Sequence, residues 1–343
     1  MKFLDLFAGI GGFRFGMESA GHECVGFCEI DKFARASYKA IHNTEGEFEF
    51  HDITQVSDED LRKFRGTVDI ICGGFPCQAF SIAGKRKGFL DETRGTLFFE
   101  IARAAKEIKP PLLFLENVKG LLSHDKGRTF RTILSTLDEL GYDAEWQILN
   151  SKNFGVPQNR ERVYIIGHLR GERTRQIFPI FGKNGTTNQA NIKQIGNINN
   201  STSFGGNPQT GRVYDVDGIS PTLNTMQGGG REPKVVIPVL TTDRFDIVLG
   251  STQKNAAKTD GNYSPTLTSA MGMGGGQIPL LVKSAIPYRI RKLTPRECWR
   301  LQGFPDWAFD KAQEVNSNSQ LYKQAGNSVT VNVIKIIAEK LDK

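Results

Sequence analysis

Short apolar runs alternate with amphipathic stretches through the first half of the chain, and this alternation constrains the fold more than any other feature. In one such stretch Leu97, Ile101, Ala105 and Ile108 recur at helical spacing. Strands that alternate with helices of this length form βαβ units, which pack as a mainly parallel, doubly wound sheet. We therefore expect an α/β fold with its ligands at the carboxyl ends of the strands.

The pattern assigns the regular elements as follows. The expected strands are residues 2–7, 23–28, 68–72, 112–116, 144–149 and 163–167. The expected helices are residues 12–20, 31–41, 58–64, 95–108 and 129–140, and later in the chain 294–301 and 331–341.

Composition changes after about residue 175, and residues 182–277 are rich in Gly, Asn, Thr and Ser. An approximate repeat lies within them, SPTLNTMQGGG at 220–230 and SPTLTSAMGMGGG at 264–276. A flexible linker has such a composition, but the β-branched and aromatic residues between the copies favour short strands and loops. We expect a large domain of residues 1–175 plus 315–343, and a small loop-rich domain at 176–314. A tandem repeat at about 195–238 and 239–283 is one arrangement of the latter.

Charge and cysteine content limit the class of protein. The net charge of +7 fits a polyanionic partner, although charge alone does not identify nucleic acid. Five cysteines without close pairs of zinc-ligand spacing argue against a disulfide framework and a structural zinc site, so we expect no metal. No apolar run is long enough to span a membrane, and the first residues lead directly into a strand-like segment. We expect a cytoplasmic protein.

A glycine-rich turn follows the first expected strand, where residues 5–13 read DLFAGIGGF. Such a turn lets the backbone approach a ligand and presents helix N-terminal N–H groups, although glycines also serve tight packing. Glu29 follows the second expected strand, where a carboxylate can accept hydrogen bonds from both hydroxyls of a ribose. A nucleoside cofactor is favoured. The alternative is an acidic helix N-cap, a role open to Asp31 in either case.

A cysteine follows the third of these strands, in the turn GGFPCQAFS at residues 73–81. Cys77 is thereby placed at the ligand-binding edge of the sheet, where a thiolate can attack an electrophilic ring carbon. A single cysteine is more often an inert core thiol, but the polar flanks oppose burial here. Glu116 ends the next strand and suits protonation or hydrogen bonding of a ring nitrogen; its alternative role is a cap or a surface group.

Two arginines flank Glu161 in the segment QNRER at residues 158–162. Arg160 and Arg162 point to one face if this segment is extended. They then orient a base or hold Glu116. A structural ion pair with Glu161 or another carboxylate is the alternative.

Taken together and in order, these segments closely resemble the bacterial and phage cytosine-5 DNA methyltransferases. The matching motifs are DLFAGIGG at 5–12, GFPCQ at 74–78, ENV at 116–118, QNRER at 158–162, RKLTPREC at 291–298 and QAGNSV at 324–329. The match covers nearly the whole chain outside the Gly/Asn-rich region. It implies a Rossmann-like sheet that binds S-adenosylmethionine (SAM), with a small target-recognition domain.

The resemblance implies a chemical role for each motif. Cys77 would attack carbon 6 of cytosine while Glu116 engages ring nitrogen 3, and carbon 5 would then take the methyl group of SAM. Arg162 would hold the base and Arg160 would organise the pocket. The family positions that line the SAM site fall on Phe7, Gly9, Gly11, Glu29, Ile30, Asp52, Pro76, Leu97 and Asn327, with Asp52 near the adenine amino group.

The resemblance also implies contacts with double-stranded DNA, from which the target base is flipped out. Residues 81–96 correspond to a mobile loop that closes over DNA, in which Ser81, Lys85, Arg86 and Lys87 suit phosphates. The family ends a recognition unit with a Thr-Leu pair, and this chain has two, at Thr222 and at Thr266. Gln209 and Arg212 lie upstream of the first pair. Two stacked units, with two specificities, and one elongated unit both remain open.

Other functions are less well supported. A related branch methylates cytosine in tRNA with the same catalytic parts, but the size of the recognition region favours duplex DNA. A silent DNA-binding module would have been free to lose Cys77, Glu116 or Arg162. Methyltransferases that modify amino nitrogens carry a different motif where this chain has Phe-Pro-Cys-Gln. We expect a monomer, which serves either beside a separately encoded restriction endonuclease or in phage self-protection.

Overall fold

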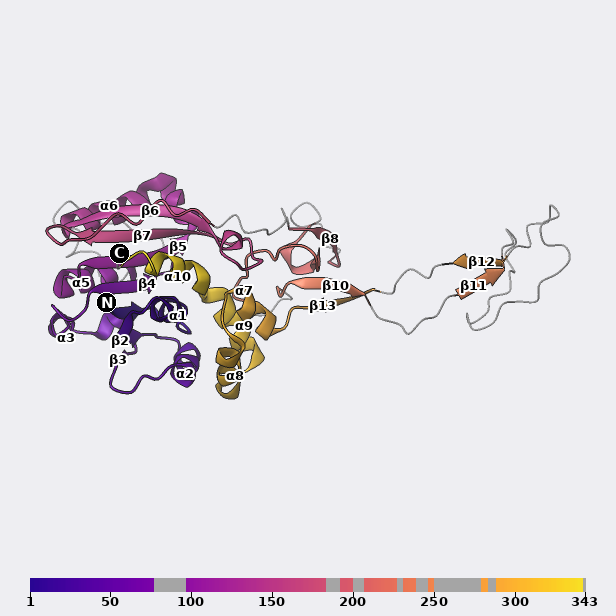
Figure 1. The fold of residues 1–343 in the computed structure, drawn as a ribbon, viewed down its shortest axis with the longest axis horizontal. Helices are drawn as coiled ribbons and strands as arrows, with labels where there is room; N and C mark the ends of the chain where they lie inside the picture. The colour runs from indigo at the N-terminus through magenta and orange to yellow at the C-terminus, as the bar shows by residue number, and fades with distance from the viewer. Residues whose placement is uncertain are drawn as a thin grey trace.

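The computed structural model describes residues 1–76, 97–182, 192–199, 207–226, 231–238, 246–249, 279–282 and 288–341. Its main body is a seven-stranded sheet in the order β3-β2-β1-β4-β5-β7-β6 (Figure 1). The strands are β1 (Lys2–Leu6), β2 (Glu23–Cys28), β3 (Phe48–Phe50), β4 (Ile70–Gly74), β5 (Leu112–Val118), β6 (Tyr142–Asn150) and β7 (Glu161–Leu169).

Neighbouring strands from β3 to β5 are parallel, which confirms the expected doubly wound α/β sheet. β7 runs antiparallel to both β5 and β6, so the last two expected strands form an antiparallel edge. β3 was not predicted from the sequence because three residues are too few to show a period.

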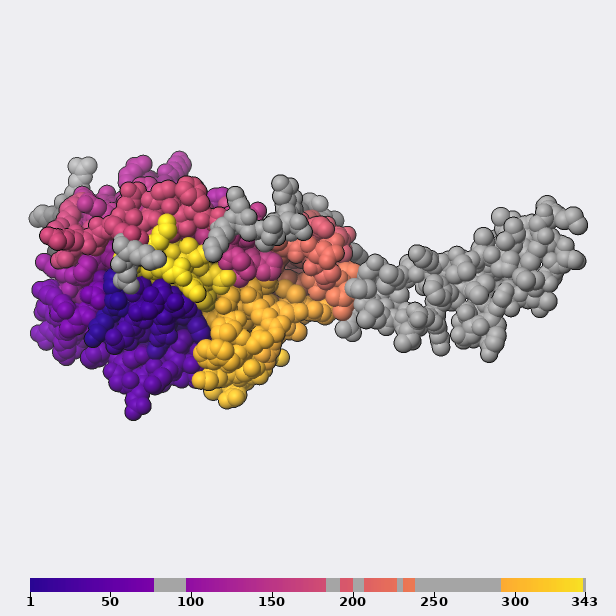
Figure 2. Space-filling model, in the orientation of Figure 1, coloured from indigo at the N-terminus to yellow at the C-terminus, as the bar shows by residue number. Residues whose placement is uncertain are grey.

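Helices cover both faces of this sheet because side chains of its strands alternate between them. Leu4 and Leu6 pack with the helices on one face, whereas Phe3 packs with those on the other. The first face carries α3 (Asp58–Arg62), α5 (Leu97–Ile108) and α6 (Arg128–Glu139). The second carries α1 (Gly12–Ser19) and α10 (Val331–Ala338), and Figure 2 shows the yellow C-terminal segment lying against the indigo N-terminal one.

A third apolar cluster surrounds Trp299, which is 1% exposed and donates its indole N–H to the Leu321 carbonyl at 3.0 Å. It is built from α7 (Pro295–Leu301), α8 (Asp306–Val315) and α9 (Asn318–Asn327), and α8 also packs on α2 (Lys32–Ile41). α7 begins with a capping box between Thr294 and Glu297. α8 and α9 were not predicted from the sequence.

A second sheet has the order β13-β10-β9-β8 and lies beside the main body (Figure 1). Its strands are β8 (Gln194–Asn197), β9 (Arg212–Asp215), β10 (Lys234–Pro238) and β13 (Tyr288–Lys292), and a separate pair is formed by β11 (Asp246–Leu249) and β12 (Pro279–Val282). Short 3₁₀ helices are η1 (Ile53–Gln55), η2 (Lys119–Leu122), η3 (His124–Gly127), η4 (Ser151–Asn153) and η5 (Gln209–Gly211).

Within these described ranges, no helix has the length and apolar character needed to cross a membrane. The same part of the chain contains no cluster of three His, Cys, Asp or Glu side chains placed to hold a metal ion.

Candidate active site

A cavity of about 390 Å³ opens at the carboxyl ends of the parallel strands, where a doubly wound sheet binds its ligands. Most of the residues expected to bind a cofactor or a base line it. They are Phe7, Gly9, Glu29, Ile30, Pro76, Leu97, Glu116, Arg160, Arg162 and Asn327. These side chains lie far apart in the chain and come from, or directly adjoin, β1, β2, β4, β5, β7, α5 and α9.

Glu29 organises the end of the cavity next to β1 and β2. Its two carboxylate oxygens accept the backbone N–H groups of Gly9 and Asp31, each at 2.7 Å. Burial raises the pKa of Glu29. Each of these oxygens keeps a second acceptor direction, which is what recognition of two vicinal hydroxyls requires.

Unusual backbone geometry and apolar surface accompany this carboxylate. Phe7 adopts a left-handed conformation with φ of 58°, which is strained for a residue other than glycine and is typical of functional sites. The side chain of Ile30 is 70% exposed although it is apolar, so it offers a surface for a flat ring to cover.

Two expected cofactor residues do not line the cavity. Gly11 has φ of 85° at the start of α1, and a Cβ there would lie 2.2 Å from His42 Nε2, so packing already requires glycine. Asp52 accepts hydrogen bonds from the backbone N–H of Thr54 at 3.0 Å and from its hydroxyl at 2.8 Å, and thereby caps η1. Any contact of Asp52 with an adenine stays a prediction.

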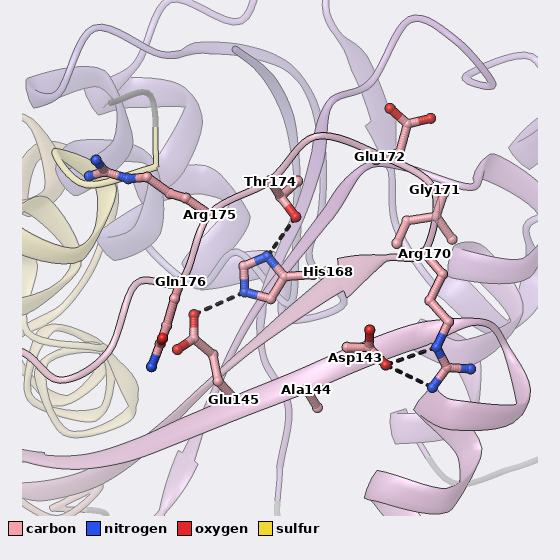
Figure 3. Close-up of a pocket in the computed structure, with 11 residues that line it drawn as sticks. Asp143, Ala144, Glu145, His168, Arg170, Gly171, Glu172, Thr174, Arg175 and Gln176 are labelled. Carbon is pink, nitrogen blue, oxygen red and sulfur yellow. Dashed lines mark hydrogen bonds and ion pairs between the residues drawn. The ribbon is translucent and has the colours of Figure 1, made fainter.

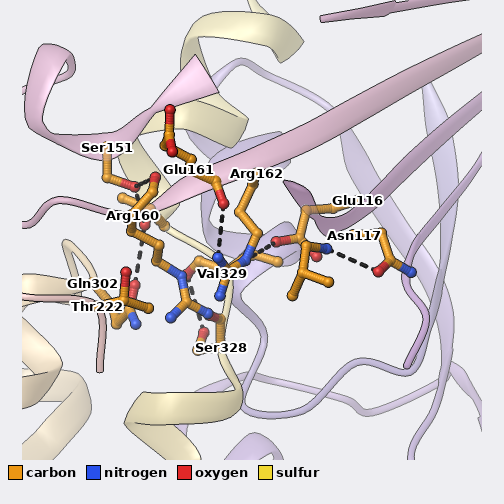
Figure 4. A network of polar contacts seen from close by, with 12 residues as sticks. Glu116, Asn117, Ser151, Arg160, Glu161, Arg162, Thr222, Gln302, Ser328 and Val329 are labelled. Carbon is orange, nitrogen blue, oxygen red and sulfur yellow. Dashed lines mark hydrogen bonds and ion pairs between the residues drawn. The ribbon is translucent and has the colours of Figure 1, made fainter. Parts of the chain in front are cut away.

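Glu116 lies at the other end of the cavity and is 7% exposed (Figure 4). Its Oε1 is 3.0 Å from Arg162 Nε, but among the described residues this atom accepts no aligned hydrogen bond, so it keeps acceptor capacity. Burial raises the pKa of Glu116, and the charges of Arg162 and Arg160 oppose that shift. A carboxyl group with this environment keeps its proton to higher pH than an exposed one, as a proton donor to a ring nitrogen must.

Arg162 therefore holds Glu116, one of the two roles expected for it. The alternative was an ion pair with Glu161 or another carboxylate. Its Glu161 part is wrong, because the Glu161 carboxylate pairs with Lys119 at 3.0 Å. Arg162 contacts Glu161 only through the backbone, where its Nη1 donates to the carbonyl at 2.8 Å.

Arg160 is 3% exposed and donates only to carbonyl groups (Figure 4). Its Nη1 donates to Leu223 at 3.2 Å, and its Nη2 donates to Gly326 at 3.2 Å and to Ser328 at 2.7 Å. Burial lowers the pKa of Arg160 to about 9, and the neighbouring charge of Arg162 adds to the effect. Arg160 thus joins its own segment to residue 223 and to residues 326–328, of which Gly326 and Ser328 line the cavity. Its role in organising the pocket stays a prediction.

Asn117 was not singled out in the sequence beyond its place in the ENV motif, yet it fixes the turn that precedes Cys77. Its amide donates to the Phe75 carbonyl at 2.8 Å and its side-chain oxygen accepts the Val118 N–H at 2.8 Å. Lys323 was also missed; its ammonium pairs with Asp31 at 2.6 Å on the cavity wall. Both depend on contacts between distant segments, which no local sequence signal reports.

Several expected residues lie outside the part of the chain that the structure describes. They are Cys77, Ser81, Lys85, Arg86, Lys87 and Thr266. Of the other expected DNA-binding residues, Gln209 begins η5 and is exposed, and Arg212 donates to the Asn207 carbonyl at 3.0 Å. Thr222 donates its hydroxyl to the Asn159 carbonyl at 2.6 Å, close to Arg160.

A different cavity, of about 470 Å³, lies at the opposite end of β6 and β7 (Figure 3). His168 lies between Glu145 Oε1 and Thr174 Oγ1, each at 2.9 Å. Glu145 also accepts the backbone N–H groups of Ile177 at 2.6 Å and Phe178 at 3.0 Å. These polar groups anchor the segment that leads from the main body towards the second sheet, a structural role.

Comparison with known proteins agrees with this arrangement. A family model described as C-5 cytosine-specific DNA methylase matches residues 1–343. The type II methyltransferase M1.ScrFI of Lactococcus lactis subsp. cremoris is 40% identical over 341 residues, which cover 99% of this chain and 77% of that protein. The orphan methyltransferase M.SPRI of Bacillus phage SPR is 33% identical over 447 residues, which cover 99% of this chain and 97% of that protein. The solved structure of S. pombe Dnmt2 methyltransferase has the same fold, with a TM-score of 0.61, 18% identity and coverage of 98% and 96%.

Proposed function

Because the chain belongs to the C-5 cytosine-specific DNA methylase family, we propose that its cavity aligns a flipped-out cytosine with SAM, and that Cys77 is the nucleophile. The protein is a SAM-dependent DNA methyltransferase that modifies carbon 5 of cytosine. The observation that carries the proposed site is that buried Glu116, held by Arg162, opens onto the same cavity as Glu29.

The cavity fits SAM in its chemistry. Glu29 would accept the ribose hydroxyls, Ile30 and Phe7 would cover the adenine, and Leu97 and Asn327 would line the remainder. SAM, when bound, supplies the methyl group that carbon 5 accepts.

The chain's own residues activate the base. Glu116, whose pKa is raised by burial, would donate a proton to ring nitrogen 3, which makes carbon 6 electrophilic. The Cys77 thiolate would form a bond to carbon 6, and the displaced electron pair makes carbon 5 nucleophilic. Once carbon 5 is methylated, its proton passes to water and the sulfur–carbon bond breaks to release the Cys77 thiolate. Ring nitrogen 3 returns its proton to Glu116, which restores the aromatic ring. Arg162 would orient Glu116 and the base throughout.

Residues 176–314 would read a short duplex sequence through loops beside the cavity. Flipping the base costs a few kcal/mol, which contacts in the cavity offset. We infer that the enzyme acts as a cytoplasmic monomer. It would protect DNA from a separately encoded nuclease or protect phage DNA, in line with the type II and orphan descriptions of its relatives.

The experiment is incubation of the purified protein with SAM and mixed-sequence duplex DNA, followed by nucleoside mass analysis, with Cys77→Ser in parallel. We expect 5-methylcytosine with the wild type only. A parallel reaction on tRNA tests the alternative substrate. If duplex DNA stays unmodified while tRNA gains 5-methylcytosine, the proposed substrate is wrong.

A further inference from the structure

Of the two repeat copies in the recognition region, the first is built into the wall of the active site. Residues 220–222 run along the segment that carries the catalytic arginines. Ser220 N–H donates to the Pro157 carbonyl at 2.8 Å, and Asn159 N–H donates to the Ser220 carbonyl at 2.9 Å. The Thr222 hydroxyl adds a bond to the Asn159 carbonyl at 2.6 Å.

The next residues of this copy are packed as tightly. Leu223 is 2% exposed within the apolar cluster around Trp299, and its carbonyl accepts from Arg160. Gly326, which lines the cavity, lies so close that a Cβ there would be 1.9 Å from the Asn224 carbonyl oxygen. The first copy therefore contacts two residues that line the cavity, Arg160 and Gly326.

In the sequence, by contrast, the second copy falls between β10 and β13, two strands that pair directly with each other. β10 pairs antiparallel with β13 from Lys234 opposite Lys292 to Pro238 opposite Tyr288. β10 also pairs with β9, and the first copy connects these two strands in the sequence. The sheet of β8, β9, β10 and β13 is therefore formed without residues 239–287. Residues 239–287 connect Pro238 to Tyr288, and these two residues are paired with each other in the sheet.

We propose that the first copy alone addresses the active site, and that residues 239–287 form an insertion that the methylation reaction does not require. This inference rests on the proposed function. The sequence-reading role expected of Gln209, Arg212 and Thr222 would then not depend on residues 239–287.

The test replaces residues 239–287 by an Asn-Gly turn, which suits a two-residue connection between antiparallel strands. Wild type and variant are given SAM and mixed-sequence duplex DNA, and modified cytosines are mapped. We expect the variant to methylate at least one of the wild-type sequences at a rate within about threefold. Loss of all methylation in a variant that keeps its cooperative unfolding and its SAM affinity would overturn the proposal.

If the shortened chain does not fold, point variants of the full chain test the proposal. Thr222→Ala removes the hydrogen bond to Asn159 and should slow methylation at every sequence that the first copy reads, by about fivefold or more. Thr132→Ala on α6, whose hydroxyl bonds only within its helix, is the matched control. The proposal is wrong if Thr266→Ala abolishes methylation at those sequences and Thr222→Ala leaves it intact. Failure of the proposed function is distinct, since the wild type itself would then yield no 5-methylcytosine.

Discussion

Replacement of Arg160 by lysine tests whether a buried guanidinium holds the active site together. Arg160 donates from two different nitrogens to three carbonyls, at 3.2, 3.2 and 2.7 Å. One ammonium nitrogen cannot occupy both positions, so we expect lysine to keep the bond to Ser328 and to lose at least one other. A hydrogen bond to a charged group contributes about 1.5–3 kcal/mol, so the free energy of unfolding should fall by about 2–4 kcal/mol.

The assay is urea denaturation followed by circular dichroism, with Arg170→Lys as the control. Arg170 pairs with two exposed carboxylates, Asp138 and Asp143, so its replacement should leave the free energy of unfolding nearly unchanged. We also expect Arg160→Lys to lower the methylation rate roughly 10- to 100-fold, because the segments it joins would shift. Equal unfolding free energies for the two variants would refute the argument from these carbonyls.

The remaining predictions concern the carboxyl groups. Glu116→Gln keeps the shape of the side chain but removes its proton, so the methylation rate should fall roughly 10²- to 10⁴-fold with SAM affinity unchanged, as measured by single turnover and titration calorimetry. Glu29→Ala should weaken SAM binding at least roughly tenfold in the same calorimetry while DNA binding by gel shift stays intact; equal SAM affinity would contradict the assigned role. Asp5 is fully buried and has no hydrogen-bond partner among the residues that the structure describes, and burial raises its pKa well above the usual value. Because the folded-state pKa is the higher one, its stabilising contribution is complete below the unfolded pKa of about 4 and is lost as pH rises through the folded pKa. Asp5→Asn should therefore flatten the fall of the unfolding free energy with rising pH, measured by denaturation from pH 4 upwards; identical slopes would contradict it.

Local patterns in the sequence predicted the elements that carry the site. The strands that deliver Glu29 and Glu116 are apolar runs bounded by turns, so their periodicity and ends are both visible in the sequence. α8 and α9 were not predicted because their sequences are largely polar and show no clear helical period of apolar residues. Tertiary packing around Trp299, not helix propensity, stabilises them.

Local patterns could not predict which groups are bound by the residues that join distant segments. Asn117, Lys323 and Arg160 each bond to groups many residues away, and their partners become apparent only once the chain is folded. The two Thr-Leu pairs, at Thr222 and Thr266, left open in the sequence which copy serves the active site. The contacts of Thr222 with Asn159 point to the first.

Arg160 also links the state of the recognition region to that of the catalytic pocket. If residues 220–226 moved away, the guanidinium would lose the Leu223 carbonyl but would stay buried against Gly326 and Ser328. A buried charge that loses partners is destabilised strongly, so the detached arrangement is disfavoured relative to the docked one. Loss of the Leu223 contact would also leave Arg162, two residues along the chain, less firmly placed against Glu116. The first recognition copy and the Glu116 carboxyl group would thus be ordered together.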